Sequence, residues 1–427
     1  MPSSVFLERG EPLAVRVLII SDRFAPEVSA VSVRSLAHAK IWRDLGHDVA
    51  VVTCAPNFPK GQVFEGYENR LYQEDDVEGV KVLRIWSYMA ANEGIVKRIF
   101  DYLSFLFSAV FLCRRFPDFD IILATSPPIF VAFAGAAVAW RRRKPWVFEV
   151  RDLWPASIRA VGVSKSPLLK LVEKLELALY RGADRVMVLT RSFKEDLVSR
   201  GIDGEKIDVV TNGVDLAQFR LPGSNNRVRA ELGVSDDALL VGYIGTTGLA
   251  HGLSTLVEAA ERCAARSDIV FLIMGEGADR KSLESAVAEK GLKNVIFRDF
   301  VGHDEVVDYI SSLDLSVVHL RPDPVFHAVI PSKIFENMAL GVPLLMAVEG
   351  ESAEIVMEAG CGVCISSGDS AMMAEAVLRL ADEREELAEM GQRGLKAVAE
   401  KFDRIVLAAA AAESLEEAIA SKKGAAS

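Results

Sequence analysis

The sequence predicts an α/β protein with two doubly wound Rossmann-like domains facing a central cleft. Three observations predict this class. Short apolar runs alternate with longer amphipathic ones, which is the order strand, helix, strand of a parallel sheet covered on both faces. The alternation stops near residues 205–235, a stretch rich in Gly, Pro, Ser and Asn, and then starts again. A length of 427 residues, half of them hydrophobic, is sufficient for two large cores.

In the first half, each short apolar run is expected to be a buried strand. We expect helices where apolar residues recur at helical spacing, and the first of these ends at the stop signal Gly46. The expected strands cover residues 15–20, 48–53, 80–86, 119–125, 146–150 and 185–190, and the expected helices 33–45, 129–141 and 168–181.

The second half repeats the pattern with its own strands and helices. Strands are expected at residues 239–244, 269–274, 294–297, 315–319 and 343–347, and helices at 253–265 and 280–290. The expected domains are residues 1–205, residues 206–403 and a C-terminal helix within 404–427 that crosses back to the first domain. Ligands of open α/β sheets bind at the carboxyl ends of the strands, so the loops there are where we expect the chemistry.

Charge and cysteine content exclude several classes of protein. Lys and Arg number 49 and Asp and Glu 60, a formal charge of −11, which argues against nucleic acid as a partner. Five scattered Cys suit a reducing compartment, and the single pair Cys361 and Cys364 is too little for a zinc site, so we expect no metal and no cofactor. The first 14 residues lack the apolar core of a secretory signal, which predicts a cytoplasmic protein.

The apolar segment 99–116 has two interpretations that stay open. It is either a core helix of the first sheet or a helix that lies on a membrane or receives a lipid-linked acceptor. Charged residues interrupt it, so it falls short of a transmembrane span. The basic run 141–144 follows another apolar helix and suits anionic lipid, which is consistent with an enzyme at the inner face of the cytoplasmic membrane.

Glycine-rich loops follow two strands of the second half. Gly245, Thr246 and Thr247 come before a helix, where free backbone N–H groups favour an anion, and His251 can add a donor. Glycine-rich turns are also common connectors, so the loop alone does not assign a function. The loop after the first strand has no GxGxxG, and the chain has no GxxxxGK[ST], which argues against dehydrogenases and P-loop ATPases.

The segment Pro331-Ser-Lys-Ile-Phe-Glu336 is the most informative one. Pro331 suits the first turn of a helix, and Lys333 and Glu336 lie three residues apart on one face. An ammonium beside free helix amides suits a diphosphate, and a carboxylate one turn later can accept from vicinal hydroxyls such as those of a ribose. An ordinary surface Lys–Glu pair explains the spacing equally well.

These motifs together resemble the retaining GT-B glycosyltransferases of family 4. The string 331–343 resembles their nucleotide-sugar site, and Asn212-Gly-Val-Asp215 with Phe219 resembles an interdomain signature. Residues 149–155, with the string Arg-Asp-Leu-Trp-Pro, resemble the subgroup that builds O-antigen, colanic acid and capsule. The resemblance covers about residues 15 to 420 and implies a GT-B fold.

The resemblance implies an N-terminal acceptor-binding domain and a C-terminal nucleotide-sugar donor-binding domain, with these site residues. The donor-binding residues are Gly245, Thr246, Thr247, His251, Gly275, Glu276, Gly277, Pro331, Ser332, Lys333 and Glu336. The acceptor-side residues are Glu27, Ser29, Ser126, Arg151, Asp152 and Trp154. Asp152, Lys333 and Glu336 are the implied catalytic residues, with Lys333 on the diphosphate and Glu336 on the ribose.

The implied partners are a nucleoside-diphosphate sugar, UDP-linked in our expectation, and a polyprenyl-diphosphate saccharide acceptor, with peripheral membrane association. The alternatives are a GT-B epimerase, a two-lobed binding protein and a non-catalytic scaffold. The sequence also departs from the family at three places. Ala328 stands where the family motif has its first glutamate, and Ser29-Ala30 stands where the family's first loop has a double glycine. The family's phosphate-binding Arg and Lys are absent, and Thr246, Thr247 and His251 stand there instead.

Overall fold

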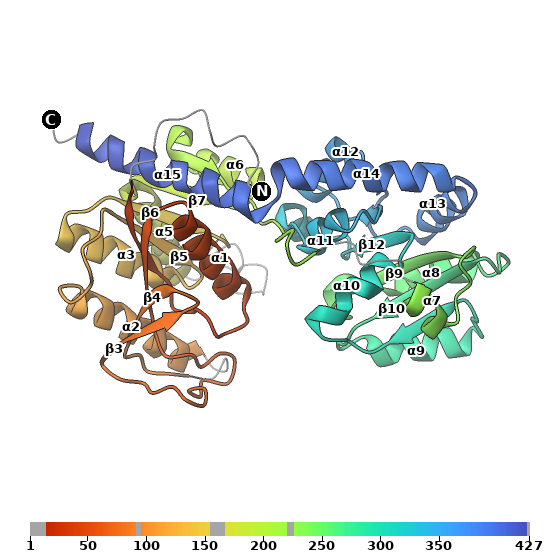
Figure 1. Cartoon of the computed structure of the whole chain (residues 1–427), viewed down its shortest axis with the longest axis horizontal. Helices are drawn as coiled ribbons and strands as arrows, with labels where there is room; N and C mark the ends of the chain where they lie inside the picture. Colours follow the sequence, from red (N-terminus) through yellow and green to blue (C-terminus); the bar gives the residue numbers. More distant parts are fainter. Residues whose placement is uncertain (1–13, 91–94, 154–166, 220–225, 425–427) are drawn as a thin grey trace. The chain divides into compact units, whose positions relative to one another are not determined.

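A computed structural model describes residues 14–90, 95–153, 167–219 and 226–424. The chain divides into two compact units (Figure 1). Unit 1 runs to Thr211 and takes up the chain again from Leu407, and unit 2 is Asn212–Val406. These divisions lie a few residues from the expected boundaries at 205 and 403. Each unit has its own sheet and its own core.

Unit 1 is built on an eight-stranded sheet. Its order is β3-β4-β2-β1-β5-β6-β7-β8, and all neighbours are parallel except β3 and β4. The central strands are apolar on both sides because helices cover both faces. The strands are β1 (Arg16–Ile20), β2 (Asp48–Thr53), β3 (Tyr72–Val77), β4 (Val80–Ile85), β5 (Ile121–Ser126), β6 (Trp146–Val150), β7 (Arg185–Val188) and β8 (Ile207–Val209).

The strand β3 is not among the strands that the sequence predicts. Its residues Tyr-Gln-Glu-Asp-Asp-Val are mostly acidic or polar, and it pairs only with β4, in an antiparallel hairpin at the edge of the sheet. An edge strand faces solvent and does not need the apolar run that marks a buried strand. Hydrophobic pattern alone therefore does not detect it.

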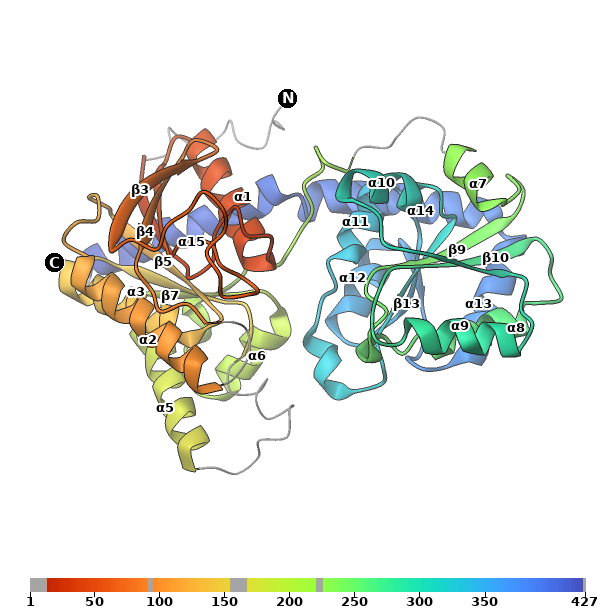
Figure 2. The same cartoon turned by 90° about the horizontal axis from the view of Figure 1, so that it is seen from below.

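Different helices cover the two faces of the first sheet. Alternate strand residues point to opposite faces, so Leu18 and Ile20 pack with α2, α3 and α5, while Val17 and Ile19 pack with α1 and α15 (Figure 2). The helices are α1 (Ala30–Asp44), α2 (Ile95–Leu112), α3 (Ile129–Arg142), α5 (Pro167–Gly182), α6 (Arg191–Ser199) and α15 (Arg404–Gly424).

Unit 2 is built on a six-stranded, wholly parallel sheet in the order β11-β10-β9-β12-β13-β14. Helices α8, α9 and α13 pack on one face, and α10, α11 and α14 on the other. The strands are β9 (Leu239–Ile244), β10 (Ile269–Met274), β11 (Val295–Arg298), β12 (Leu315–His319), β13 (Leu344–Ala347) and β14 (Gly362–Cys364). The helices are α7 (Asn226–Leu232), α8 (Ser254–Arg262), α9 (Arg280–Glu289), α10 (His303–Ser311), α11 (Lys333–Ala339), α12 (Glu351–Ala359), α13 (Ser370–Asp382) and α14 (Arg384–Lys401).

Among the described residues, no helix is both long enough and apolar enough to cross a bilayer.

Candidate functional site

Two glycine loops meet at the carboxyl edge of the second sheet. The Thr247 N–H donates to the Glu276 carbonyl at 2.9 Å, which joins the loop after β9 to the loop after β10. A Cβ on Gly275 would lie 1.9 Å from the Gly245 carbonyl oxygen, and one on Gly277 would lie 2.4 Å from the Thr247 carbonyl. Glycine is therefore required at both positions for this close approach.

Lys333 opens α11 and carries its ammonium to these loops. Its Nζ lies 3.9 Å from the centroid of the Tyr243 ring and 2.7 Å from the place that a Cβ on Gly245 would occupy. Burial lowers the pKa of Lys333 to about 8, and the nearby Glu336 carboxylate opposes that shift. At pH 7 the group is still mostly protonated, so a cation lies against Gly245 at the end of β9.

The same loops hold buried polar atoms that lack partners. Thr247 is fully buried, and neither its Oγ1 nor the Nδ1 of His251 has a hydrogen-bond partner in the described part of the chain. Burial and the charge of Lys333 lower the pKa of His251, so this imidazole is neutral at pH 7 and can donate without carrying charge. Buried polar atoms are usually paired, and these two point to a bound ligand or water.

The remaining donor-side residues lie around this centre. The Ser332 carbonyl accepts from the Glu336 N–H at 3.3 Å, so the first turn of α11 places Glu336 one turn after Lys333, where it is half-buried. Pro331 immediately precedes Ser332. Thr246 and Glu276 expose their side chains on the two loops. The structure thus groups the sequence-predicted donor residues at one edge of one sheet.

Another carboxylate lies near the position where the family motif has its first glutamate. Ala328 ends a short 3-10 helix, and the preceding residue His327 places its Nε2 3.2 Å from Glu349 Oε2. A Cβ on Gly350 would lie 2.2 Å from the His327 carbonyl oxygen, so the two segments lie close together. Glu349 comes just before α12, so this carboxylate reaches the region from a different segment.

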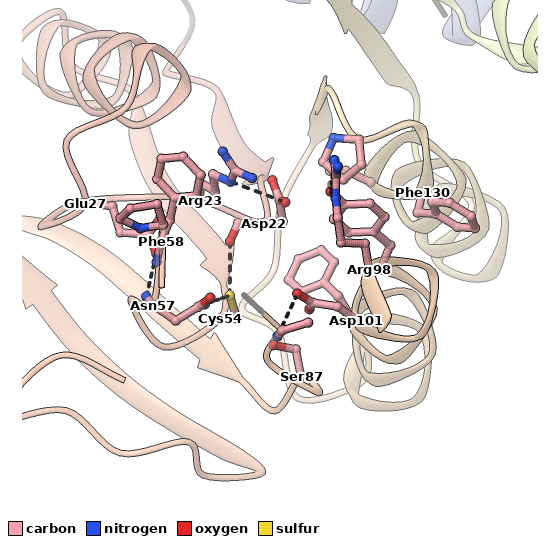
Figure 3. A pocket seen from close by; sticks show the side chains of 16 residues that line it. Asp22, Arg23, Glu27, Cys54, Asn57, Phe58, Ser87, Arg98, Asp101 and Phe130 are labelled. Carbon is pink, nitrogen blue, oxygen red and sulfur yellow. Dashed lines mark hydrogen bonds and ion pairs between the residues drawn. The ribbon is translucent and has the colours of Figure 1, made fainter. Parts of the chain in front are cut away.

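The carboxyl edge of the first sheet holds a polar pocket (Figure 3). Glu27 Oε1 accepts the N–H groups of Asn57 at 2.6 Å and Phe58 at 2.9 Å, which ties the loop after β1 to the loop after β2. Arg23 lies over the Phe58 ring at 3.9 Å. From α2, Asp101 points into the same pocket and accepts the N–H of Ala90 at 3.4 Å.

The carboxyl groups of this pocket are shifted toward their neutral forms. Burial raises the pKa of Asp22 to about 7 and that of Asp101 to about 6, and it raises the pKa of Glu27 as well. Asp22 Oδ1 and Glu27 Oε2 have no hydrogen-bond partner within the described ranges. Only about 30 Å³ of the pocket admits water-sized groups, so it suits a hydroxyl rather than a whole sugar ring.

A buried charge cluster lies at the end of β6. The Arg34 Nε of α1 donates to Glu149 Oε1 at 2.8 Å, and its two Nη groups donate to the carbonyls of Val210 and Thr211. Burial alone would raise the pKa of Glu149, but the charges of Arg34, His38 and Arg151 outweigh it and hold the pKa at about 2. Burial lowers the pKa of Arg151 to about 10.

The other acceptor-side residues have these places. Ser29 caps α1, and its Oγ accepts the Ser32 N–H at 3.2 Å. Ser126 is buried, and its carbonyl accepts the Arg151 N–H at 3.3 Å. Asp152 directly follows Arg151 after β6, and Trp154 lies outside the described residues.

Sequence reasoning missed Asp22 and Asp101. Asp22 stands in the loop after β1, one of the loops where the sequence places the chemistry, and Asp101 is a single acid within an apolar helix. That interruption could have identified Asp101, because a carboxyl group on the buried side of an apolar helix needs polar neighbours. In the ranges that the structure describes, no group of three or more His, Cys, Asp or Glu could hold a metal ion.

Two family models match the chain in succession. Residues 29–213 match the glycosyl transferase 4-like domain, and residues 224–397 match the glycosyl transferases group 1. Together the two models cover most of both units.

Relatives of known description share about a quarter of their residues with the chain. An Escherichia coli (strain K12) protein, WcaI, is described as a putative colanic acid biosynthesis glycosyl transferase and is 23% identical over 78% of this chain and 84% of its own. The GDP-mannose-dependent alpha-mannosyltransferase of Mycobacterium tuberculosis (strain CDC 1551 / Oshkosh) is 25% identical over 89% of this chain and 92% of its own.

Solved structures share the fold. Anabaena HepE, in complex with UDP and glucose, has a TM-score of 0.68 at 17% identity and covers 94% of this chain and 99% of its own. Sucrose-phosphate synthase from Thermosynechococcus elongatus has a TM-score of 0.68 at 18% identity, over 93% of this chain and 98% of its own.

Proposed function

We propose a specific activity for this chain, which is a family 4 glycosyltransferase with the GT-B fold and transfers a sugar from a nucleotide sugar. It moves a hexosyl or N-acetylhexosaminyl group, with retention at the anomeric carbon, from a UDP-linked donor to a polyprenyl-diphosphate saccharide. The product is an intermediate of a cell-surface polysaccharide. The relationship to WcaI supports the pathway, and the complex of HepE with UDP supports uridine as the base.

The Lys333 ammonium against the glycine loops is the observation that carries this proposal. A half-buried cation beside two closely packed glycine loops suits a diphosphate, and bound phosphate would raise the pKa of Lys333 again. Thr247 and neutral His251 can donate to the same phosphates. Glu336, one turn further, accepts from the ribose hydroxyls.

The pocket of unit 1 supports an acceptor role for the first domain. Asp22 and Glu27 each present an unpartnered carboxyl oxygen that can accept a hydrogen bond from an acceptor hydroxyl. Arg151, with two buried guanidinium nitrogens that lack partners among the described residues, suits a phosphate or an anionic sugar. The assignment of Asp152 and Trp154 to the acceptor stays a prediction.

The transfer then needs stabilisation of charge on the leaving group. The bond from the anomeric carbon to the diphosphate breaks, and a bond from the acceptor oxygen forms on the same face. The hydroxyl proton passes to the leaving phosphate oxygen. Lys333 and the loop amides stabilise the charge that develops on the diphosphate. Such electrostatic stabilisation of the transition state is usually the largest single contribution to catalysis.

Nucleotide binding and transfer test this function. We expect saturating UDP to raise the melting temperature of the purified chain. Lys333→Met should weaken UDP binding about tenfold or more, because it removes one charge-assisted contact of about 1.4 kcal/mol or more. A screen of UDP- and GDP-sugars with polyprenyl-diphosphate saccharides should give a product whose anomeric configuration matches the donor.

Lys396→Met is the matched control, because Lys396 is exposed on α14 of the same unit. It should leave UDP affinity unchanged. Glu336→Ala should abolish transfer, whereas a scaffold would keep its function in cells. An isomerised nucleotide sugar formed without acceptor would indicate an epimerase instead, and the absence of any nucleotide-induced shift or transfer would refute the proposal.

A further inference from the structure

We propose that the exposed face of α2, together with the basic C-terminal end of α3, docks this protein onto an anionic lipid bilayer. We call this surface the α2–α3 face, and define it by Val96, Phe100, Phe107, Phe111, Arg114, Trp140, Arg141 and Arg143. All these residues belong to unit 1, and the two helices pack against each other. The proposal does not depend on which sugar the enzyme transfers.

One side of α2 is an apolar stripe open to solvent. Phe107 is 66% and Phe111 77% exposed, and Val96 and Phe100 are exposed as well. The spacing of 96, 100, 107 and 111 places all four on one side of a helix. The opposite side, with Phe105 and Ala109, is buried in the core. One side of the helix therefore packs on the sheet, as in the core-helix interpretation, and the other side is open to solvent in the described part of the chain.

A cluster of basic residues lies where the stripe ends. Arg114 continues the stripe by one turn, and Arg141 and Arg143 are at the end of α3 beside Trp140, which is 81% exposed. These residues line an open groove of about 750 Å³. Within the described ranges, Arg114, Arg141 and Arg143 form no ion pair. Asp118 is nearby, but it pairs with Arg16 and lies within 3.9 Å of Arg142 and Lys144.

The charge pattern favours an anionic bilayer over a second copy of the chain. The whole protein carries −11, so its average surface is repelled by an anionic membrane, and only a local basic cluster can orient it. Exposed Phe and Trp beside Arg match a helix that lies in the lipid interface, with its rings among the acyl chains and its cations at the headgroups. A copy–copy contact would bring Arg against Arg.

The face also shares a helix with the polar pocket. Asp101 points from α2 into the pocket, one residue after the exposed Phe100. If the acceptor is lipid-linked, as we propose above, docking through α2 would bring its saccharide to this pocket. That step rests on the proposed function, whereas binding to lipid does not.

Vesicle binding by the full chain tests the proposal without substrate. We expect the protein to sediment with vesicles of phosphatidylglycerol and phosphatidylcholine, and about tenfold less with phosphatidylcholine alone. Phe107→Ser with Phe111→Ser, and separately Arg141→Glu with Arg143→Glu, should each lower the bound fraction about tenfold. Brominated lipid should quench the fluorescence of the wild type more than that of Trp140→Phe.

Two control variants carry changes of the same kind in unit 2. Phe300→Ser alters an exposed Phe of unit 2, and Lys281→Glu with Lys293→Glu makes the same charge change on exposed residues of that unit. Both should bind vesicles as the wild type does, and all variants should keep its melting temperature because the changed side chains lie at the surface. The proposal is overturned if the wild type ignores anionic vesicles, if the controls lose as much binding, or if the wild type is a dimer that Phe107→Ser with Phe111→Ser dissociates.

Discussion

Gly275 is the residue whose missing side chain allows the two loops of the donor site to meet. Its φ is +138°, a conformation that other residues rarely adopt, and its hydrogen occupies the space next to the Gly245 carbonyl. The Lys333 ammonium lies beside the same contact, 2.7 Å from the place that a Cβ on Gly245 would occupy. Backbone packing at Gly275 therefore shapes the place that we assign to the diphosphate.

We expect Gly275→Ala to destabilise the protein by about 2 kcal/mol or more and to weaken UDP binding, since it combines backbone strain with a clash against main chain. Gly291→Ala is the control. Gly291 also has a positive φ, +63°, but open space around it, so strain alone should cost about 1 kcal/mol. Denaturant unfolding measures both. Equal costs for the two variants would contradict the clash.

Asp22 is expected to make stability fall as the pH rises. Its folded pKa of about 7 lies above the usual value of about 3.9, so the folded protein holds this proton more tightly between these pH values. Raising the pH from 6 to 8 should therefore remove about 1.4 kcal/mol of unfolding free energy through this group. Asp22→Asn should flatten that part of the pH profile.

The exposed Asp48 at the start of β2 provides the control for this measurement. Asp48→Asn should leave the slope between pH 6 and 8 as it is in the wild type. A slope that survives in Asp22→Asn would assign the pH dependence to other groups and would show that Asp22 is ionised in the folded protein throughout this range.

At the scale of elements, the local sequence pattern predicts that α15 is a helix but not where it packs. Its sequence is mostly Ala, Glu and Ile, and the helix that the sequence predicts within 404–427 is close to the observed Arg404–Gly424. The helix packs on the first sheet beside α1, and the Trp42 Nε1 donates to the Ala408 carbonyl at 2.7 Å. Small residues at its inner positions let it lie close to α1.

Ala411 and Ala410 test this packing as neighbours on one helix. Ala411 is fully buried, so Ala411→Asp should cost about 3 kcal/mol or more by burying an unpaired carboxylate. Ala410 is exposed, and Ala410→Asp should change stability by about 0.5 kcal/mol or less. Unfolding in denaturant measures the difference. Equal effects would mean that α15 does not pack on the sheet as described.

At the scale of the whole molecule, the net charge conceals opposite local charges. The chain carries −11, yet Lys333 in unit 2 and the arginines of the α2–α3 face in unit 1 are local cations. Our proposals assign the first to a diphosphate and the second to anionic lipid. The net charge therefore argues against nucleic acid as a partner, while local basic sites can still bind a diphosphate or anionic lipid headgroups.

Local sequence pattern predicted most of the strands and helices, and together with the family resemblance it predicted the donor motif from Lys333 to Glu336, which stays a prediction. Both depend on neighbours a few residues apart, through apolar periodicity and one helical turn. Tertiary structure alone decided that Asp101 points into the pocket of Asp22, that Gly275 abuts Gly245, and which side of α2 stays exposed. These relations join segments far apart in the chain, or depend on how a whole sheet covers a helix, so no local pattern encodes them.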